Sequence, residues 1–501
     1  MDRTRRANVH PEPHCDRYFR RVIPPTPQNL RDSQSGPPPH RSYPGDACGS
    51  KRFYLLTLGC PKNSVDSEGM HGRLVDAGWQ GVDLPEEADL LIVNTCGFIE
   101  LAREESYAAL KDLAQTKLAH QRLLAAGCLA QRYGRQVQRS VRGVDGLLGT
   151  REWSGIVARA EQLFGGQASG QSQASNDRSL VAPVRRLSHG GSAFLEIADG
   201  CSSSCAFCAI PKIKGAQCSK PEQLILDEAR QLAARSVREI ILIAQDTTAY
   251  GRDLGEPDAL PRIIQSLLET VPHVPWLRLM YAYPQHVTSH LIETMATHRQ
   301  VCHYLDLPLQ HAHPETLRRM QRSPDMDGIH RLIGRLRIAM PDISLRTTFI
   351  VGYPGETEEE FVTLLEFLDE IHFDKVGIFT YSAEEHTAAA QLPGSVAPEE
   401  AQARHARAME LQQRISLQRN QEQIGRVLEV LVEGSDSGVS VARSYREAPE
   451  IDGYVLVAGQ LPVGGLVRVK IEHATEYDLQ GRVVDNEPSG LERPCDAESR
   501  R

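Results

Sequence analysis

A strand-then-helix unit recurs six times between about residues 190 and 390, and this repeat constrains the fold more than any other feature. Each unit contains a short apolar run, then glycine or polar residues, then a stretch of helical periodicity. Such alternation predicts parallel strands joined by helices, and six units fall short of the eight that close a barrel. We therefore expect an open, partial α/β barrel with its functional face at the carboxyl ends of the strands. The expected strands lie in 193–200, 239–246, 276–284, 303–311, 344–356 and 375–382.

Two regions of different periodicity flank this repeat. Upstream, apolar runs at 53–60, 88–98 and 121–130 alternate with helical stretches, which predicts an open parallel α/β sheet. Downstream, a long polar helix over 398–425 is followed by short runs of period two with Gly turns, which predicts a small antiparallel β-barrel. The overall fold class is thus α/β with a C-terminal β-barrel.

The length of 501 residues is compatible with about three domains, at ~150 residues each. We predict a Pro-rich disordered tail over 1–50, an N-terminal domain over 51–165 and a Gly/Ser/Gln-rich linker over 166–186. The barrel core would span 187–417, the β-barrel 420–489, and a tail 490–501. No apolar run approaches the ~20 residues of a membrane helix, and the basic N-terminus lacks the apolar core of a signal peptide, so a cytoplasmic protein without membrane contact is expected.

Three cysteines crowd into one stretch of eight residues directly after the first strand of the repeat. Cys201, Cys205 and Cys208 are too close together for chance, and the reducing cytoplasm favours metal ligands over disulfides. One interpretation is a structural zinc site, for which Cys218 is the candidate fourth ligand. The other is a four-iron, four-sulfur cluster held by three cysteines, which leaves its fourth iron open for a small molecule.

This spacing, Cys-x3-Cys-x2-Cys on the first loop of a partial α/β barrel, resembles the radical S-adenosylmethionine enzymes. The resemblance implies that the open iron binds S-adenosylmethionine and that an electron from the cluster cleaves it to a 5′-deoxyadenosyl radical. Cofactor contacts are expected from four further positions, although each has an ordinary structural alternative in packing, a turn or loop polarity. These positions are Phe207, Gln245, Gly352 and Gly355.

One stretch departs from the pattern of that family. The family usually has two arginines around a serine after the cysteine loop, whereas this chain has Cys218 and Lys220 in their places. Lys220 keeps a positive charge but cannot form the bidentate hydrogen bonds of arginine, and Cys218 carries no positive charge. Any contact that those arginines make is therefore in doubt here.

A second set of three cysteines is spread over the N-terminal domain. Cys60, Cys96 and Cys128 each follow an apolar run directly. If those runs are parallel strands of one sheet, all three thiols emerge at its carboxyl edge, where open α/β sheets bind ligands. They can then hold a second cluster, again one ligand short; the alternative is that they are buried core residues.

This arrangement is similar to the methylthiotransferases, and the similarity covers about residues 51 to 490. That family combines an N-terminal three-cysteine domain, a radical S-adenosylmethionine core and a C-terminal β-barrel called TRAM. The resemblance implies two 4Fe-4S clusters and an electron donor such as flavodoxin. The cluster on Cys201 would make the radical, and the cluster on Cys60 would carry the sulfur that is methylated and inserted.

Two branches of the family act on different substrates, a transfer-RNA adenosine or the β-carbon of an aspartate in a small-subunit ribosomal protein. The stretches 59–70, 244–251 and 442–455 resemble the protein-modifying branch. Residues 424–485 contain six Arg and Lys against ten Asp and Glu, so this barrel is acidic, which favours a basic ribosomal protein over RNA. Methylthiolation of transfer RNA stays as one alternative, and a non-catalytic zinc or iron–sulfur protein that docks on the ribosome as another.

Overall fold

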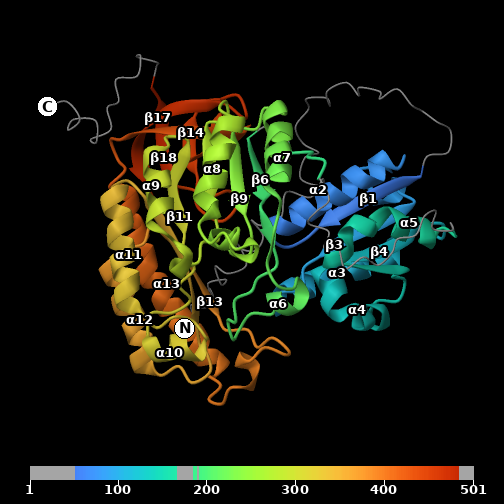
Figure 1. Ribbon diagram of the computed structural model, residues 1–501, viewed down its shortest axis with the longest axis horizontal. Coiled ribbons are helices and arrows are strands. Elements are labelled where there is room, and N and C mark those ends of the chain that lie inside the picture. Colours follow the sequence, from blue (N-terminus) through green and yellow to red (C-terminus); the bar gives the residue numbers. More distant parts are fainter. Residues whose placement is uncertain (1–50, 166–183, 189–190, 485–501) are drawn as a thin grey trace, which may run out of the picture.

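The computed structural model describes residues 51–165, 184–188 and 191–484 as three domains with a shared interface (Figure 1). The predicted tails over 1–50 and 490–501 and most of the predicted linker over 166–186 lie outside the described residues. The linker's last residues are described, and Val184 and Arg186 there are buried. None of the helices in the described ranges combines the length and apolarity needed to cross a membrane.

The N-terminal domain is a five-stranded sheet in the order β2-β1-β3-β4-β5, and every pair is parallel. The prediction of an open parallel sheet is confirmed, with two short edge strands that periodicity did not reveal. The central strand β3 is buried along its whole length, and four of its six residues, LLIV in LLIVNT, form a continuous apolar run. The elements are β1 (Arg52–Thr57), α2 (Pro61–Asp76), β2 (Gln80–Gly81), β3 (Leu90–Thr95), α3 (Glu100–Thr116), β4 (Arg122–Gly127), α4 (Cys128–Ser140), β5 (Gly146–Gly149) and α5 (Ile156–Leu163).

The central domain contains all six expected strands in one open parallel sheet of order β13-β12-β11-β10-β9-β6. The partial barrel is therefore confirmed. Its strands are β6 (Ser192–Glu196), β9 (Glu239–Ile243), β10 (Trp276–Leu279), β11 (Val301–Asp306), β12 (Ser344–Val351) and β13 (Lys375–Thr380). Its helices are α6 (Ile210–Ile213), α7 (Glu222–Ala234), α8 (Ala259–Thr270), α9 (Ser289–Thr297), α10 (Pro314–Arg319), α11 (Met326–Ala339), α12 (Glu358–Ile371) and α13 (Pro398–Gln421). A two-stranded ribbon of β7 (Ala198–Asp199) and β8 (Cys218–Ser219) brackets the cysteine loop.

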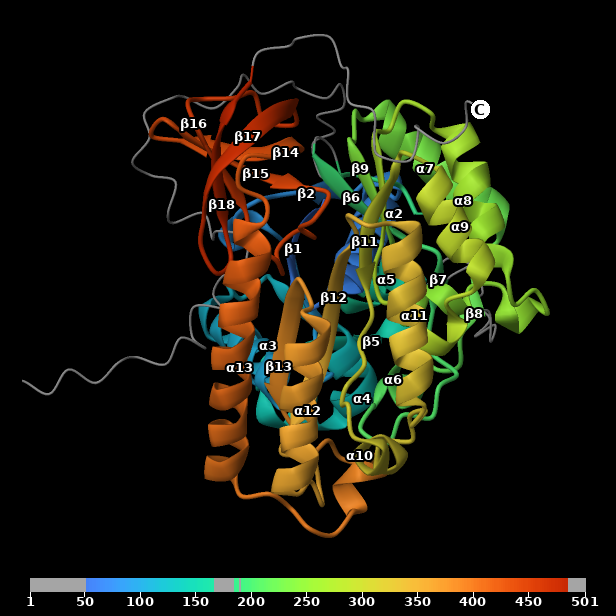
Figure 2. The ribbon, with the colours of Figure 1, turned by 90° about the vertical axis from the view of Figure 1, so that its left-hand side faces the viewer.

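The helices cover one face of this sheet, as Figure 2 shows for α8, α9, α11, α12 and α13. Alternate residues of β9 explain why both faces are apolar. Ile240 and Leu242 pack in the large core beneath the helices. Ile241 and Ile243 point to the other face, into a cluster that includes Val65 of α2 and Leu431 of the C-terminal domain. The inner face of the partial barrel is therefore covered by the two flanking domains.

The C-terminal domain is a closed barrel of order β14-β15-β16-β18-β17, reached through α13 (Figure 2). Its strands are β14 (Val427–Asp436), β15 (Val439–Ser444), β16 (Val455–Ala458), β17 (Leu466–Ala474) and β18 (Leu479–Val483). The small barrel is confirmed, but it is not purely antiparallel, because β16 and β18 pair in parallel. Closure between these two strands leaves no edge strand exposed to other chains.

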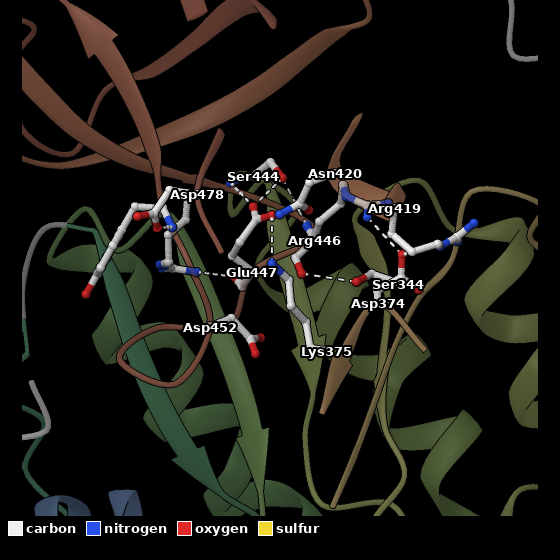
Figure 3. Close-up of polar contacts among 12 residues, drawn as sticks. Ser344, Asp374, Lys375, Arg419, Asn420, Ser444, Arg446, Glu447, Asp452 and Asp478 are labelled. Carbon is white, nitrogen blue, oxygen red and sulfur yellow. Dashed lines mark hydrogen bonds and ion pairs between the residues drawn. The ribbon is translucent and has the colours of Figure 1, made fainter. Parts of the chain in front are cut away.

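Buried ion pairs hold this barrel on the central sheet. Figure 3 shows Arg446, whose guanidinium lies 2.8 Å from Asp374, and Glu447, which accepts a hydrogen bond from Ser444. Nearby, Glu239 of β9 receives Arg278 of β10 at 2.6 Å and Arg443 of β15 at 2.7 Å, and all three side chains are fully buried. Burial alone would raise the pKa of Glu239, but the two arginines outweigh it and lower that pKa to about 2.

We predict that Glu239→Gln destabilises the protein by about 3–5 kcal/mol, because two buried guanidinium groups lose their shared counter-ion. Thermal or urea unfolding measures the change. The exposed pair of Glu222 and Arg262 offers a control, since Glu222→Gln should cost less than about 1 kcal/mol. The difference in unfolding free energy between wild type and Glu239→Gln should be complete above pH 4.5, the ordinary pKa of a glutamate. It should disappear as the pH falls toward 2, because the pKa of Glu239 is lower in the folded state than in the unfolded state. Equal losses in the two variants would contradict this role for Glu239.

Candidate functional site

The Cys201–Cys208 loop leaves the central sheet at its carboxyl edge, between β7 and α6. Gly200 starts it with φ of +70°, and a Cβ there would lie 2.4 Å from the carbonyl oxygen of Ala216, so only glycine fits. The Cys201 amide donates to the Gly215 carbonyl, and the Ala206 amide donates to the Met320 carbonyl. The loop is therefore anchored at its start and in its middle.

The environment of these three partly buried thiols combines low polarity with one nearby cation. Burial raises the pKa of Cys201 and raises that of Cys208 to about 12. Nη1 of Arg322 lies 3.7 Å from the sulfur of Cys205, while the guanidinium also stacks on Tyr283. Without a metal, thiols with a raised pKa are protonated, so metal binding would have to release those protons.

The second set of cysteines lies where the strand pattern predicted it. Cys60 caps α2 after β1, Cys96 follows β3, and Cys128 opens α4 after β4, so all three lie at the carboxyl edge of neighbouring parallel strands. A Cβ on Gly59 would lie 2.7 Å from Cβ of Cys96, which shows how closely the first two loops approach. Asn63 joins the loops, because its amide donates to the carbonyls of Leu58 and Thr95.

Two of these N-terminal thiols, Cys96 and Cys128, are buried, whereas Cys60 is half-buried like the thiols of the first loop. Oδ1 of Asn63 lies 3.8 Å from the sulfur of Cys128. Burial raises the pKa of Cys96 to about 12 and raises that of Cys128 further. Lys214 partly offsets the effect on Cys128. Two buried thiols of this kind are costly as thiolates unless a metal takes up their charge.

The two sets of cysteines share one interface between the domains. Cys128 packs against Ala209 and Ile213, and Ala209 directly follows Cys208. Lys214 reaches across to Asp66 of α2 at 3.2 Å and also contacts Asp199 at 3.2 Å. A molecule bound at either set of thiols therefore lies close to the other set.

Each donor set consists of three cysteines, a composition that fits an iron–sulfur cluster. In the described ranges, no three Cys, His, Asp or Glu side chains are close enough together to hold one metal ion, and Cys218 completes no such group. A zinc ion needs all its ligands at a single point. Thiolates that bind different irons of one cluster do not, and an all-thiolate set is typical of such clusters.

The structure shows the surroundings of the other predicted cofactor positions, which stay predictions. Phe207 packs against Ala206, Met320 and Tyr353, and Gln245 is half-buried beyond the end of β9. A Cβ on Gly352 would lie 2.5 Å from Cβ of Ala401, so the absence of a side chain at Gly352 lets α13 pack closely there.

Gly355 and Lys220 each have a polar partner within the central domain. Gly355, with φ of +76°, donates its amide to the carbonyl of Gly394. Lys220 is buried and pairs with Glu228 at 2.9 Å. The lysine that replaces a family arginine thus has a carboxylate within its own domain.

Several charged groups around the cysteines were missed by sequence reasoning. Lys62, Lys214 and Arg322 border the two sets of thiols, and no spacing rule marks them, because each arrives from a different element. Burial lowers the pKa of Lys62. Only the tertiary structure places each of these cations, since Lys62 contacts Tyr281, Lys214 contacts Asp66 and Arg322 lies near Cys205.

Three family models match successive parts of the chain. They are the Uncharacterized protein family UPF0004 at residues 52–149, the Radical SAM superfamily at 195–368 and the TRAM domain at 424–484. Each match falls on one of the three sheets described above.

A solved structure with the same fold is the radical S-adenosylmethionine methyltransferase TsrM from Kitasatospora setae, with a TM-score of 0.53 at 14% identity. The alignment covers 78% of this chain and 81% of that one. Because the identity is low, this likeness concerns the fold alone.

Curated relatives are far more similar in sequence. A protein from Chloroflexus aurantiacus is 49% identical over 86% of this chain and all of its own length, and one from Roseiflexus castenholzii is 48% identical over 86% and 96%. Both are named ribosomal protein uS12 methylthiotransferase RimO. With this identity over nearly the whole length of those proteins, and with all three domains present, the chain belongs to the RimO family of radical SAM methylthiotransferases.

Proposed function

We propose that this enzyme replaces a hydrogen on the β-carbon of an aspartate in ribosomal protein uS12 with a methylthio group. S-adenosylmethionine would serve both as methyl donor and as radical source. The protein substrate comes from the names of the relatives, and the target carbon from the family resemblance.

The observation that best supports this reaction is the shared interface of the two sets of thiols. Cys128 of one set packs against Ala209, the residue after Cys208 of the other. Cys201, Cys205 and Cys208 would hold the cluster that binds S-adenosylmethionine, and Cys60, Cys96 and Cys128 would hold the second. When bound, these groups supply one-electron chemistry and a methylated sulfur. A substrate carbon at this interface would be within reach of both.

The surface of the C-terminal barrel supports a protein substrate over RNA. Two of its six basic residues, Arg443 and Arg446, are buried and paired with carboxylates, so they are not free to bind phosphate. Most of its acidic side chains stay exposed or half-buried, as at Glu429, Asp436 and Glu472. Such a surface attracts a basic ribosomal protein and repels a phosphate backbone.

We expect about eight irons and eight sulfides per chain after anaerobic reconstitution, since two four-iron clusters would be bound. Metal and sulfide analysis measures this. One zinc per chain with little iron would instead favour the non-catalytic alternative.

The two sets of thiols should be separable by mutation. Cys201→Ala should abolish formation of 5′-deoxyadenosine, whereas Cys60→Ala should retain it and lose methylthiolation. Chromatography of the nucleoside and mass spectrometry of the protein substrate give the two readouts. Cys302→Ala is the matched control, because Cys302 is buried at the amino end of β11 and its cluster contains no cysteine of either set. Loss of both activities in Cys60→Ala would argue against this division of roles.

A direct comparison of substrates tests the proposed function itself. The reconstituted enzyme, given uS12 and transfer RNA in parallel, should add the mass of a methylthio group to uS12 alone. Modification of the transfer RNA and not of uS12 would overturn the proposal.

A further inference from the structure

Buried cations in this protein are almost all neutralised by carboxylates. Among the described residues, four lysines and five arginines are buried. Eight of these nine have a carboxylate within 4.0 Å. Lys62 is the exception: it is 4% exposed, and within the described residues no hydrogen bond or ion pair involves its ammonium group.

Lys62 lies beside the N-terminal set of thiols, where α2 meets the central domain. It belongs to the first turn of α2, two residues after Cys60, and its Nζ lies 3.5 Å from the ring centre of Tyr281. Tyr281 comes shortly after β10, at the carboxyl edge of the central sheet. Its φ of +61° is strained for a residue with a side chain, and strain of this kind is concentrated at functional sites.

The carboxylates nearest to Lys62 do not neutralise it by contact. Glu196 and Asp199 act on Lys62 electrostatically, and within the described residues neither forms an ion pair with it. Asp199 lies 3.2 Å from Lys214 instead, and Oε1 of Glu196 is buried with no hydrogen-bond partner in that part of the chain. The ring of Tyr281 offers a cation–π contact, which is weaker than an ion pair with a carboxylate. A buried ammonium group without an anion in contact is costly, and a bound carboxylate would remove much of that cost.

We propose that Lys62 binds the carboxylate of the target aspartate and so positions its β-carbon between the two sets of thiols. Cys60 and Tyr281 are only partly buried, and the side chain would enter past them. This inference rests on the proposed function and extends it, because it gives the enzyme a physical reason to select an acidic side chain. Lys62 is a substrate-binding and positioning residue in this scheme.

The test is a double-mutant cycle on binding, read by fluorescence anisotropy with the reconstituted enzyme. The probes are two labelled uS12 peptides that carry either the target aspartate or asparagine. Wild-type enzyme should prefer the aspartate peptide by roughly 10- to 100-fold, the range for a hydrogen bond to a charged group. Lys62→Met should bind both peptides alike, and Lys62→Arg should restore part of the preference. Lys111→Met, on the exposed face of α3, is the control and should keep the wild-type preference.

Two further measurements on Lys62→Met separate substrate binding from a role in holding the cluster. Its iron content and its formation of 5′-deoxyadenosine should both match the wild type. An unchanged aspartate preference in Lys62→Met would overturn the inference while leaving the proposed function intact. Loss of about four irons in Lys62→Met would also overturn it, since Lys62 would then serve the cluster. If the wild-type enzyme modifies transfer RNA and not uS12, the proposed function fails first.

Discussion

The organisation of this protein depends on the direction of two parallel sheets whose carboxyl edges meet at one interface. Loops at the carboxyl edge of a parallel sheet can gather side chains from several strands, because every strand ends on the same side. The N-terminal sheet gathers Cys60, Cys96 and Cys128 in this way. The central sheet presents the Cys201–Cys208 loop at its own edge, and Cys128 packs next to that loop. The two sets of three thiols thereby lie beside the same domain interface.

The closed C-terminal barrel stabilises this arrangement from the other end of the sheet. Glu239, the first residue of β9, binds arginines from β10 and β15, so charge neutralisation is completed only when the barrel docks. The same docking removes basic side chains from the barrel surface. The residues that stabilise the domain interface are therefore also among those on which the proposed preference for a protein substrate rests.

Lys62 shows how a departure from the general pattern points to function. The protein pairs its other buried cations with carboxylates and leaves one ammonium group beside Cys60 and Tyr281 without one. In a folded interior such an imbalance is costly unless a ligand completes it. A substrate carboxylate is the anion that the proposed reaction brings there.

Periodicity alone predicted all six central strands, the three main N-terminal strands and the small barrel, because these apolar runs are buried on both faces or alternate with a period of two. It missed β2 and β5, which are too short to show a period, and the parallel pairing of β16 with β18, which depends on barrel closure. Spacing and strand-end position also singled out the six cysteines. The close approach of Ala401 to Gly352, a predicted cofactor contact, has no signal in the sequence, because α13 arrives there from far along the chain. The sequence by itself thus determined the elements and the thiols, since both are local patterns. The tertiary structure alone decided that the two sets of thiols adjoin and that Lys62 lies unneutralised beside them, because those contacts join residues that are far apart in the chain.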